Sequence, residues 1–259
     1  MKKLKELYAN YRGTALIVFA AFVLYELATD VYGVLDVVLF PGFSKIWPTM
    51  IASGPKFLEC FISSMTLLIP GYFGAAFTGI MLGVAIALSP RAHKSLKPII
   101  FALNPIPPSM LTPYLIAVMP TFYLSSVAVI FIGCFWPFLV GTINGILLID
   151  QKYIDNAKVL EFRGFKRLVT VILPAASPMI LAGAGTALNF AFILLTVAEM
   201  FATNSGMGYY IQYYADFSDY ARVLGGLLFT IVVIVTIMTC FDRFKKRVLF
   251  WTLNEHHYD

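Results

Sequence analysis

The sequence predicts an all-α membrane protein with six transmembrane helices and one short helix outside the membrane. Of its 259 residues, 59% are hydrophobic and only 13% are charged. Soluble domains carry about 25% charged residues, so 19 Lys and Arg with 14 Asp and Glu are too few to cover a soluble globule of this length. The composition excludes a soluble enzyme, a disordered protein and a disulfide-rich secreted module.

Apolar segments long enough to cross the hydrocarbon core, about 20 residues each, recur six times. The first follows Lys2, Lys3 and Lys5, which is also the charge pattern of a signal peptide. No small-residue cleavage site follows Ala28 and hydrophobic residues continue to Phe40, which favours a retained anchor. The expected spans lie near residues 14–34, 61–88, 98–119, 122–149, 170–201 and 223–241.

The basic residues indicate the side of each connection, because cytoplasmic loops are enriched in Lys and Arg. With the N-terminus in the cytoplasm, alternation of six spans places every basic residue except Lys45, Lys56 and Arg222 on the cytoplasmic side. The sequence therefore predicts a multi-pass protein with both termini in the cytoplasm. The net charge of +5 follows from this topology, and we expect no nucleic-acid partner.

The reactive side chains argue against an enzyme. Cys60, Cys134 and Cys240 lie in apolar segments without paired spacing, as expected of small buried hydrophobic residues. The three histidines fall outside the expected spans, and no span carries two carboxylates at its middle. We expect no catalytic residue, no metal site and no cofactor bound by this chain.

The third expected span is interrupted by prolines. The run Asn104-Pro105-Ile106-Pro107-Pro108 places three prolines in four residues, and each one removes a backbone donor and disrupts a regular helix. Irregular backbone at membrane depth is tolerated only where protein buries it or water reaches it. The segment therefore indicates a pathway or a gate.

Polar residues of the third and fifth spans are candidates for lining this pathway. Ionisable groups inside a bilayer are costly and usually functional, but Glu199 falls near the external end of its span. Two alternatives stay open for Glu199, a structural capping role and a position at an external gate; Tyr114 is equally suited to packing between helices. The candidate path residues are Asn104, Pro105, Pro107, Pro108, Tyr114, Asn189, Thr196 and Glu199.

The longest expected cytoplasmic connection covers residues 150–169. Its spacing predicts a short amphipathic helix in which Tyr153, Ala157 and Leu160 share one face. Gly164 permits a turn before the chain re-enters the membrane. The alternative is a solvated loop lying on the membrane surface.

This connection resembles the cytoplasmic loop of ABC importer permeases, whose pattern is Glu-Ala-Ala, three residues, Gly, and Leu-Pro about a dozen residues later. Asp155-Asn156-Ala157 stands at the Glu-Ala-Ala position, and Leu173-Pro174 lies at the expected distance. The resemblance indicates the branch that serves nitrate, sulfonates, taurine, bicarbonate and some vitamin precursors. Further matching segments are Leu39-Phe40-Pro41, the proline run at 104–108, Val197-Ala198-Glu199 and Ser205-Gly206-Met207-Gly208-Tyr209.

The loop also departs from the family pattern. Asp155 replaces the glutamate, Asn156 the first alanine and Glu161 the glycine, while Gly164 follows three residues later. We therefore expect the usual turn to be displaced or replaced, and a degenerate loop suits one member of a heteromeric permease pair.

The resemblance implies a type I importer permease in the inner membrane of a bacterium. Two permease subunits, identical or paralogous, would form the path, with an external solute-binding protein delivering the solute. A dimer of cytoplasmic ATPases would bind ATP and Mg, since this sequence has no Gly-x-x-x-x-Gly-Lys-Ser/Thr motif. The implied ATPase-coupling residues are Tyr153, Asp155, Asn156, Ala157, Lys158, Leu160, Glu161, Gly164 and Pro174.

Two other transport classes remain as alternatives. A secondary transporter normally places ionisable groups at the midplane or repeats its topology in two halves, and neither feature is apparent. The membrane scaffold of an energy-coupling vitamin transporter also presents cytoplasmic helices to ATPases, but the spacing from loop to Leu-Pro favours the binding-protein-dependent type.

Overall fold

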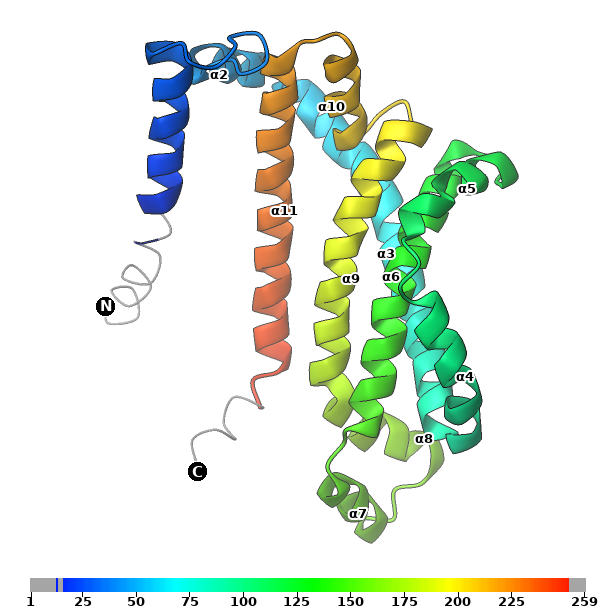
Figure 1. The fold of residues 1–259 in the computed structure, drawn as a ribbon. Coiled ribbons are helices and arrows are strands. Elements are labelled where there is room, and N and C mark those ends of the chain that lie inside the picture. Colours follow the sequence, from blue (N-terminus) through cyan, green and yellow to red (C-terminus); the bar gives the residue numbers. More distant parts are fainter. Residues whose placement is uncertain (1–12, 14–15, 252–259) are drawn as a thin grey trace. The chain divides into compact units, whose positions relative to one another are not determined.

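A computed structural model describes residue 13 and residues 16–251 of the chain, and all regular elements in that part are helices (Figure 1). The described residues fall into two compact units. One comprises the chain up to Glu59 together with Tyr210–Thr230, and the other comprises Cys60–Tyr209 with the chain from Ile231 onward.

Four helical stretches are long and apolar enough to cross a membrane. They are α3 (Gly54–Leu88), α6 (Phe122–Leu147), the stretch Gly164–Phe201, and α11 (Tyr220–Val248). A fifth results if α4 (Pro90–Leu103) and the bent segment Pro108–Val118 form one span. The all-helical membrane fold is confirmed, and the described residues supply four or five of the six expected spans. The expected first span, 14–34, lies partly outside the described residues.

The third span is broken where the prolines predict a break. α4 ends at Leu103, where the Asn104 N–H donates to the Ile100 carbonyl at 2.9 Å. After Pro105 and Pro107 the chain restarts as a 3-10 turn, η2 (Pro108–Leu111), and then as α5 (Thr112–Val118). The two helical parts meet at 77°, because prolines supply no N–H with which the helix could continue.

Close helix packing in the second unit depends on small residues. A Cβ added to Gly79 or Gly83 of α3 would lie 2.8 Å from the Phe138 Cβ and 2.7 Å from the Thr142 Cβ of α6. Likewise α6 meets α9 (Leu173–Ala202), where a Cβ on Gly141 would lie 3.1 Å from the Gly183 Cα. Contacts this short let backbones approach without side chains between them, so α6 packs against α3 and α9.

Between α6 and α9 the chain forms the predicted short helix as α7 (Gln151–Val159), followed by α8 (Gly164–Arg167) and a π-helical turn, η3 (Leu168–Ile172). The wider π turn ends at Ile172, two residues before Pro174, which has no N–H to donate. In the second unit α7 and α8 lie at the same end as α4 (Figure 1).

The first unit contains a π-helical turn, η1 (Leu27–Val31), the helix α2 (Phe43–Ala52), and the parts of α3, α10 (Met207–Asp216) and α11 within its bounds. The Phe57 ring stacks on Phe229, with centroids 4.6 Å apart, and lies 5.1 Å from the Tyr210 ring. Tyr210 also donates a hydrogen bond to the Ser53 Oγ at 3.0 Å. These contacts form an aromatic cluster that holds the three helices together.

Candidate functional site

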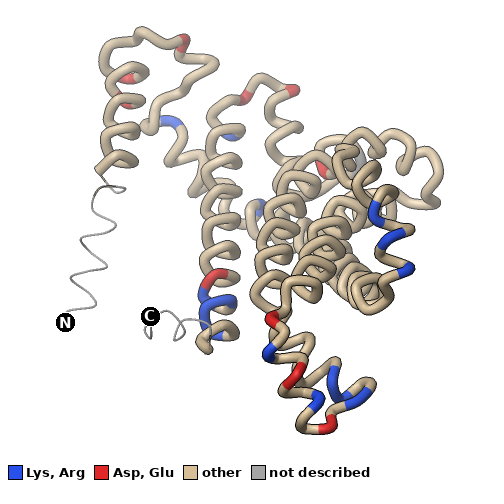
Figure 2. The backbone as a smooth tube through the Cα atoms, turned by 60° about the horizontal axis from the view of Figure 1, so that its bottom comes forward, with Lys and Arg blue, Asp and Glu red and all other residues tan. Residues whose placement is uncertain are grey.

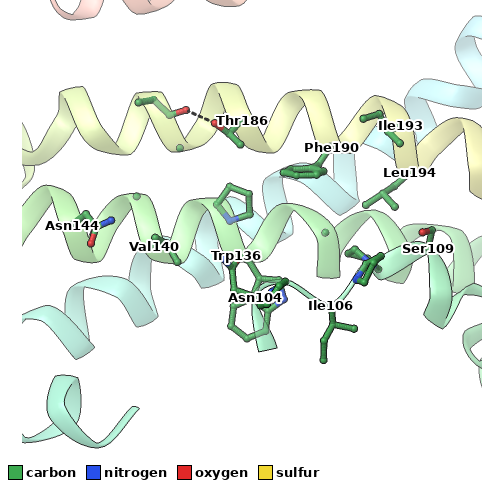
Figure 3. Close-up of a pocket in the computed structure, with 18 of the residues that line it drawn as sticks. Asn104, Ile106, Ser109, Trp136, Val140, Asn144, Thr186, Phe190, Ile193 and Leu194 are labelled. Carbon is green, nitrogen blue, oxygen red and sulfur yellow. Dashed lines mark hydrogen bonds between the residues drawn. The ribbon is translucent and has the colours of Figure 1, made fainter. Parts of the chain in front are cut away.

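A cavity of about 580 Å³ lies at the break between α4 and α5, against α6 and α9 (Figure 3). The proline connection contributes Asn104 and Ile106, α6 contributes Trp136, and α9 contributes Thr186 and Phe190. Of the expected path residues, four line this cavity: Asn104, Pro105, Pro107 and Pro108. We call it the central cavity.

The walls of the central cavity are mainly apolar. The polar side-chain groups that line it are the carboxamides of Asn104 and Asn144, the hydroxyls of Ser109 and Thr186 and the indole N–H of Trp136, and none of its lining residues is ionisable. Thr186 donates its own hydrogen to the Ala182 carbonyl at 3.3 Å. The cavity therefore offers neutral hydrogen-bonding groups to a small solute, without a fixed charge.

The other expected path residues lie away from the central cavity. Tyr114 of α5 is 65% exposed, and Asn189 of α9 is also exposed. Thr196 is half-buried and donates to the Phe192 carbonyl of its own helix at 3.0 Å. The structure thus brings the residues of the proline connection together at the central cavity. Tyr114 of α5 and Asn189 and Thr196 of α9 are not part of its lining.

Glu199, in the last turn of α9, is fully buried with 0% exposure. Its carboxylate accepts hydrogen bonds from the Ser64 hydroxyl of α3 at 2.5 Å and from the Gly208 N–H at 2.7 Å. The Ser64 Oγ in turn accepts the Met207 N–H at 3.0 Å. These amides belong to the first turn of α10, whose N–H groups have no partner within the helix. Of the two alternatives for Glu199, this geometry is that of a cap.

The partners of Glu199 were not identified from the sequence. Gly206 has φ +126°, and a Cβ there would overlap the Glu199 carboxylate. A Cβ on Gly208 would lie 2.6 Å from the Thr196 carbonyl. The pair of glycines just after an acidic helix end was the available signal that backbone approaches this carboxylate closely.

A similar cap occurs in the first unit. The Glu26 carboxylate accepts the N–H of Phe43, the first residue of α2, at 3.1 Å. In each unit an acidic side chain near the end of one helix therefore accepts a backbone N–H at the N-terminus of the short helix that follows. The favourable interaction of a carboxylate with the helix dipole adds to each cap.

The start of α7 is capped locally. The Asp150 carboxylate accepts the Lys152 N–H at 2.9 Å. Asp155 accepts from the Lys158 ammonium at 2.8 Å and from the Gln151 side chain at 3.1 Å. These two hydrogen bonds lower the pKa of the Asp155 carboxyl below its ordinary value, so this side chain stays charged and keeps its partners at neutral pH.

The end of α7 retains the turn for which the family pattern uses glycine. Glu161 has φ +55°, its N–H donates to the Lys158 carbonyl at 3.0 Å, and the Phe162 N–H donates to the Ala157 carbonyl at 2.9 Å. This pair of bonds is a Schellman motif with its left-handed residue at Glu161. The turn therefore stays at the position of the family pattern with Glu161 in place of glycine, and Gly164 forms a second left-handed residue with φ +53°.

The exposed apolar surface of the α7–α8 segment differs from the predicted face. Ala157 is 1% exposed and packs within the second unit, so it does not share an exposed face with Tyr153 and Leu160. Tyr153 is 38% exposed, and the most exposed apolar side chains are Val159, Leu160 and Phe165 at 82%, 61% and 78%. We call these last three the α7–α8 apolar face; two of them, Val159 and Phe165, were missed because helical spacing does not show which side packs inward.

Lys and Arg gather around the same end of the second unit (Figure 2). They lie on α4, on α7 and on the segment leading through α8; the residues are Arg91, Lys94, Lys97, Lys152, Lys158, Arg163, Lys166 and Arg167. Over residues 13 and 16–251, no three His, Cys, Asp or Glu side chains are grouped so as to hold a metal ion.

Residues 76–250 match the family model of the binding-protein-dependent transport system inner membrane component. The chain is 35% identical over 163 residues to the putative aliphatic sulfonates transport permease protein SsuC of Bacillus subtilis, covering 63% of this chain and 59% of that protein. It is 33% identical over 141 residues to the nitrate import permease protein NrtB of Synechococcus elongatus, covering 54% and 50%. These alignments thus span only half to three-fifths of the two relatives' lengths.

Two further similarities concern more of the chain. The chain is 28% identical over 189 residues to the taurine transport system permease protein TauC of Escherichia coli, covering 73% of this chain and 69% of that protein. A chain of the inward-facing MetNI methionine ABC transporter superposes with a TM-score of 0.63 at 16% identity, covering 78% of this chain and 98% of that one. At that identity the superposition shows the fold alone. With the family match over residues 76–250, the chain belongs to the binding-protein-dependent inner membrane components of ABC importers, in the branch of the sulfonate, nitrate and taurine permeases.

Proposed function

We propose that this chain is the membrane-spanning permease subunit of an ATP-driven importer for a small oxoanion. Its partners are a second permease subunit, a pair of cytoplasmic ATPases that bind ATP and Mg, and an external binding protein that delivers the solute. The observation that carries the proposal is the α7–α8 segment, a capped helix between two apolar spans that presents Val159, Leu160 and Phe165 outward.

Coupling requires that movement of an ATPase be transmitted to the membrane helices as a rigid-body motion. The α7–α8 apolar face supplies a surface for the ATPase, and the buried Ala157 anchors the other side of α7. The Schellman motif at Glu161 fixes the direction in which the chain leaves α7. A helix held at its start, its end and one face moves with the spans it connects.

The solute path runs through the central cavity. The named relatives transport sulfonates, nitrate and taurine, and the neutral carboxamides of Asn104 and Asn144 suit an oxoanion that must bind and then leave. The break at the proline connection exposes backbone groups that a continuous helix would use internally. Two permease copies, or this chain and a paralogue, complete the walls.

The proposed orientation places α7 and both termini in the cytoplasm of a bacterial cell. The basic residues of α4 and of the α7–α8 segment support this side, since Lys and Arg are retained in cytoplasmic loops. The ATPases then meet the α7–α8 apolar face from the cytoplasm.

The test is reconstitution with the partners encoded beside this chain. The complex of permease, ATPase and binding protein is placed in vesicles, and uptake of labelled ethanesulfonate, taurine and nitrate is measured with and without ATP. We expect uptake that requires ATP, the ATPase and the binding protein. Uptake by the chain alone would show a secondary transporter, and ATP-driven uptake without any binding protein would show a scaffold of the energy-coupling type.

A further inference from the structure

A second cavity, of about 220 Å³, lies between α4 and α6. His93 and Lys97 line it from α4, one helical turn apart and therefore on the same face. Ile100 and Phe101 continue that face with apolar side chains. We call this space the α4–α6 cavity.

The α4–α6 cavity and the central cavity have walls in common. Asn104, Val140 and Asn144 line both. Asn104 is the C-cap residue of α4, and Asn144 lies one turn beyond Val140 on α6. A solute bound at these carboxamides is therefore in contact with both spaces.

The charge of the α4–α6 cavity has one sign. Neither α4 nor α6 contains an Asp or Glu residue, and among the described residues no carboxylate forms an ion pair with Lys97. The remaining walls, Ile100, Phe101, Val140 and Ile143, are apolar. Lys97 is exposed, so its ammonium group can attract an anion from solution by an unopposed Coulombic interaction.

We propose that the α4–α6 cavity is an oxoanion site through which the solute leaves the central cavity. The Lys97 ammonium and the His93 ring bind the oxygens of the anion, and the carboxamides of Asn104 and Asn144 transfer it from the central cavity. The site lies at the end of the second unit that also carries α7 (Figure 1), so it attracts the anion toward the ATPase side. This step rests on the proposed function for the identity of the solute, whereas the anion site itself rests on the cavity.

Basic residues on α4 are also explained by membrane topology, because Lys and Arg are retained on the cytoplasmic side. A control on the same helix is therefore needed to distinguish this explanation from an oxoanion site. Lys94 and Lys97 are both exposed, but only Lys97 lines the cavity. A role in membrane topology applies to both lysines alike. Of the two lysines, only Lys97 contributes to the proposed oxoanion site.

The experiment places a cysteine in the cavity and measures its reaction with charged reagents. Ile100→Cys is made with Cys240→Ser, because Cys60 and Cys134 are buried whereas Cys240 is exposed. The complex is held in phosphatidylcholine nanodiscs, open on both faces. The rates with anionic sulfonatoethyl and cationic trimethylammonioethyl methanethiosulfonate are compared, with and without ethanesulfonate.

We expect the anionic reagent to react faster and ethanesulfonate to slow it. Lys97→Gln should lower the ratio of anionic to cationic rates by about fivefold, because it removes a positive charge that no carboxylate among the described residues offsets. Lys97→Arg should retain the ratio, and Lys94→Gln should leave it unchanged.

Equal ratios in the parent and in Lys97→Gln, or an equal fall with Lys94→Gln, would overturn the proposal. A further possible result is that phosphatidylglycerol in the nanodisc slows labelling of the introduced cysteine and ethanesulfonate does not. That result would assign the cavity to a lipid headgroup instead. The labelling does not depend on transport. If the cavity is charge-selective but the chain takes up solute without the ATPase, the proposed function is refuted and the anion site is supported. If uptake is ATP-driven but the cavity is not charge-selective, the anion site is refuted and the proposed function is supported.

Discussion

Glu199 and Ser64, which are 135 positions apart, are joined by a buried hydrogen bond of 2.5 Å that links the end of α9 to α3. The same two side chains accept the Gly208 and Met207 amides. Because Glu199 Oε2 accepts the Gly208 N–H and Ser64 Oγ accepts the Met207 N–H, Glu199 and Ser64 together hold the connection from α9 to α10. The local consequences of this cap can be measured.

Glu199→Ala should destabilise the protein strongly. It removes both hydrogen bonds of a fully buried carboxyl group and leaves the buried Gly208 N–H without its acceptor, and an unsatisfied buried group alone costs about 1–3 kcal/mol. Thermal unfolding in detergent, followed by tryptophan fluorescence, measures the loss. Glu59→Ala is the control, because it removes an exposed ion pair with Lys56, a kind of contact worth about 0–1 kcal/mol. Equal losses in the two variants would contradict the cap.

Gly206→Ala should cost more than Gly164→Ala. Both glycines have a positive φ, but only at Gly206 does an added Cβ overlap another group, the Glu199 carboxylate. At Gly164 nothing lies within 4 Å, so the cost is that of the left-handed backbone, about 1–2 kcal/mol. The same unfolding measurement ranks the two variants. A larger loss at Gly164 would show that α10 does not approach Glu199 as described.

Glu161→Gly should stabilise the end of α7. A non-glycine residue at φ +55° carries a penalty of about 1–2 kcal/mol that glycine does not. Hydrogen exchange of the Glu161 and Phe162 amides, the donors of the Schellman motif, should slow in the variant. Faster exchange at these positions would mean that Glu161 holds the turn through its side chain.

Gly183→Leu should separate α6 from α9 and disrupt the central cavity. A Cβ at Gly183 would already lie 2.5 Å from the Pro137 carbonyl, and helices that meet through glycine cannot admit a larger side chain without moving apart. We expect loss of uptake of more than tenfold, with reduced thermal stability. Gly54→Leu is the control, since nothing lies within 4 Å of that glycine. Full uptake by Gly183→Leu would contradict the close packing.

The parts of the fold that depend on local composition could be predicted from the sequence. Apolar length indicated the spans, the three prolines indicated the break at Asn104, and α7 formed where its spacing predicted a helix. Each of these follows from residues close together in the chain. The size of the bend, 77° between the two helical parts, did not follow from the prolines alone.

The parts that depend on distant partners could not be predicted. The role of Glu199 requires Ser64, which no local pattern connects to it. Residues other than glycine disfavour a positive φ, so the sequence did not indicate a left-handed turn at Glu161. The turn forms because backbone hydrogen bonds to the Ala157 and Lys158 carbonyls hold it. The burial of Ala157 depends on which side of α7 packs inward, and periodicity identifies a face without showing what covers it.

The central claim is that the α7–α8 apolar face couples the ATPase to the membrane helices. Leu160→Asp places a charge on this face, whereas Leu148→Asp makes the same substitution at a leucine that is 72% exposed in the connection before α7. In vesicles holding the full complex, ATP-driven uptake and ATPase retention are measured together. We expect Leu160→Asp to reduce uptake by more than tenfold and to weaken ATPase retention, while its thermal stability and the uptake of Leu148→Asp stay at the parent level. Full ATP-driven uptake by Leu160→Asp would contradict the claim.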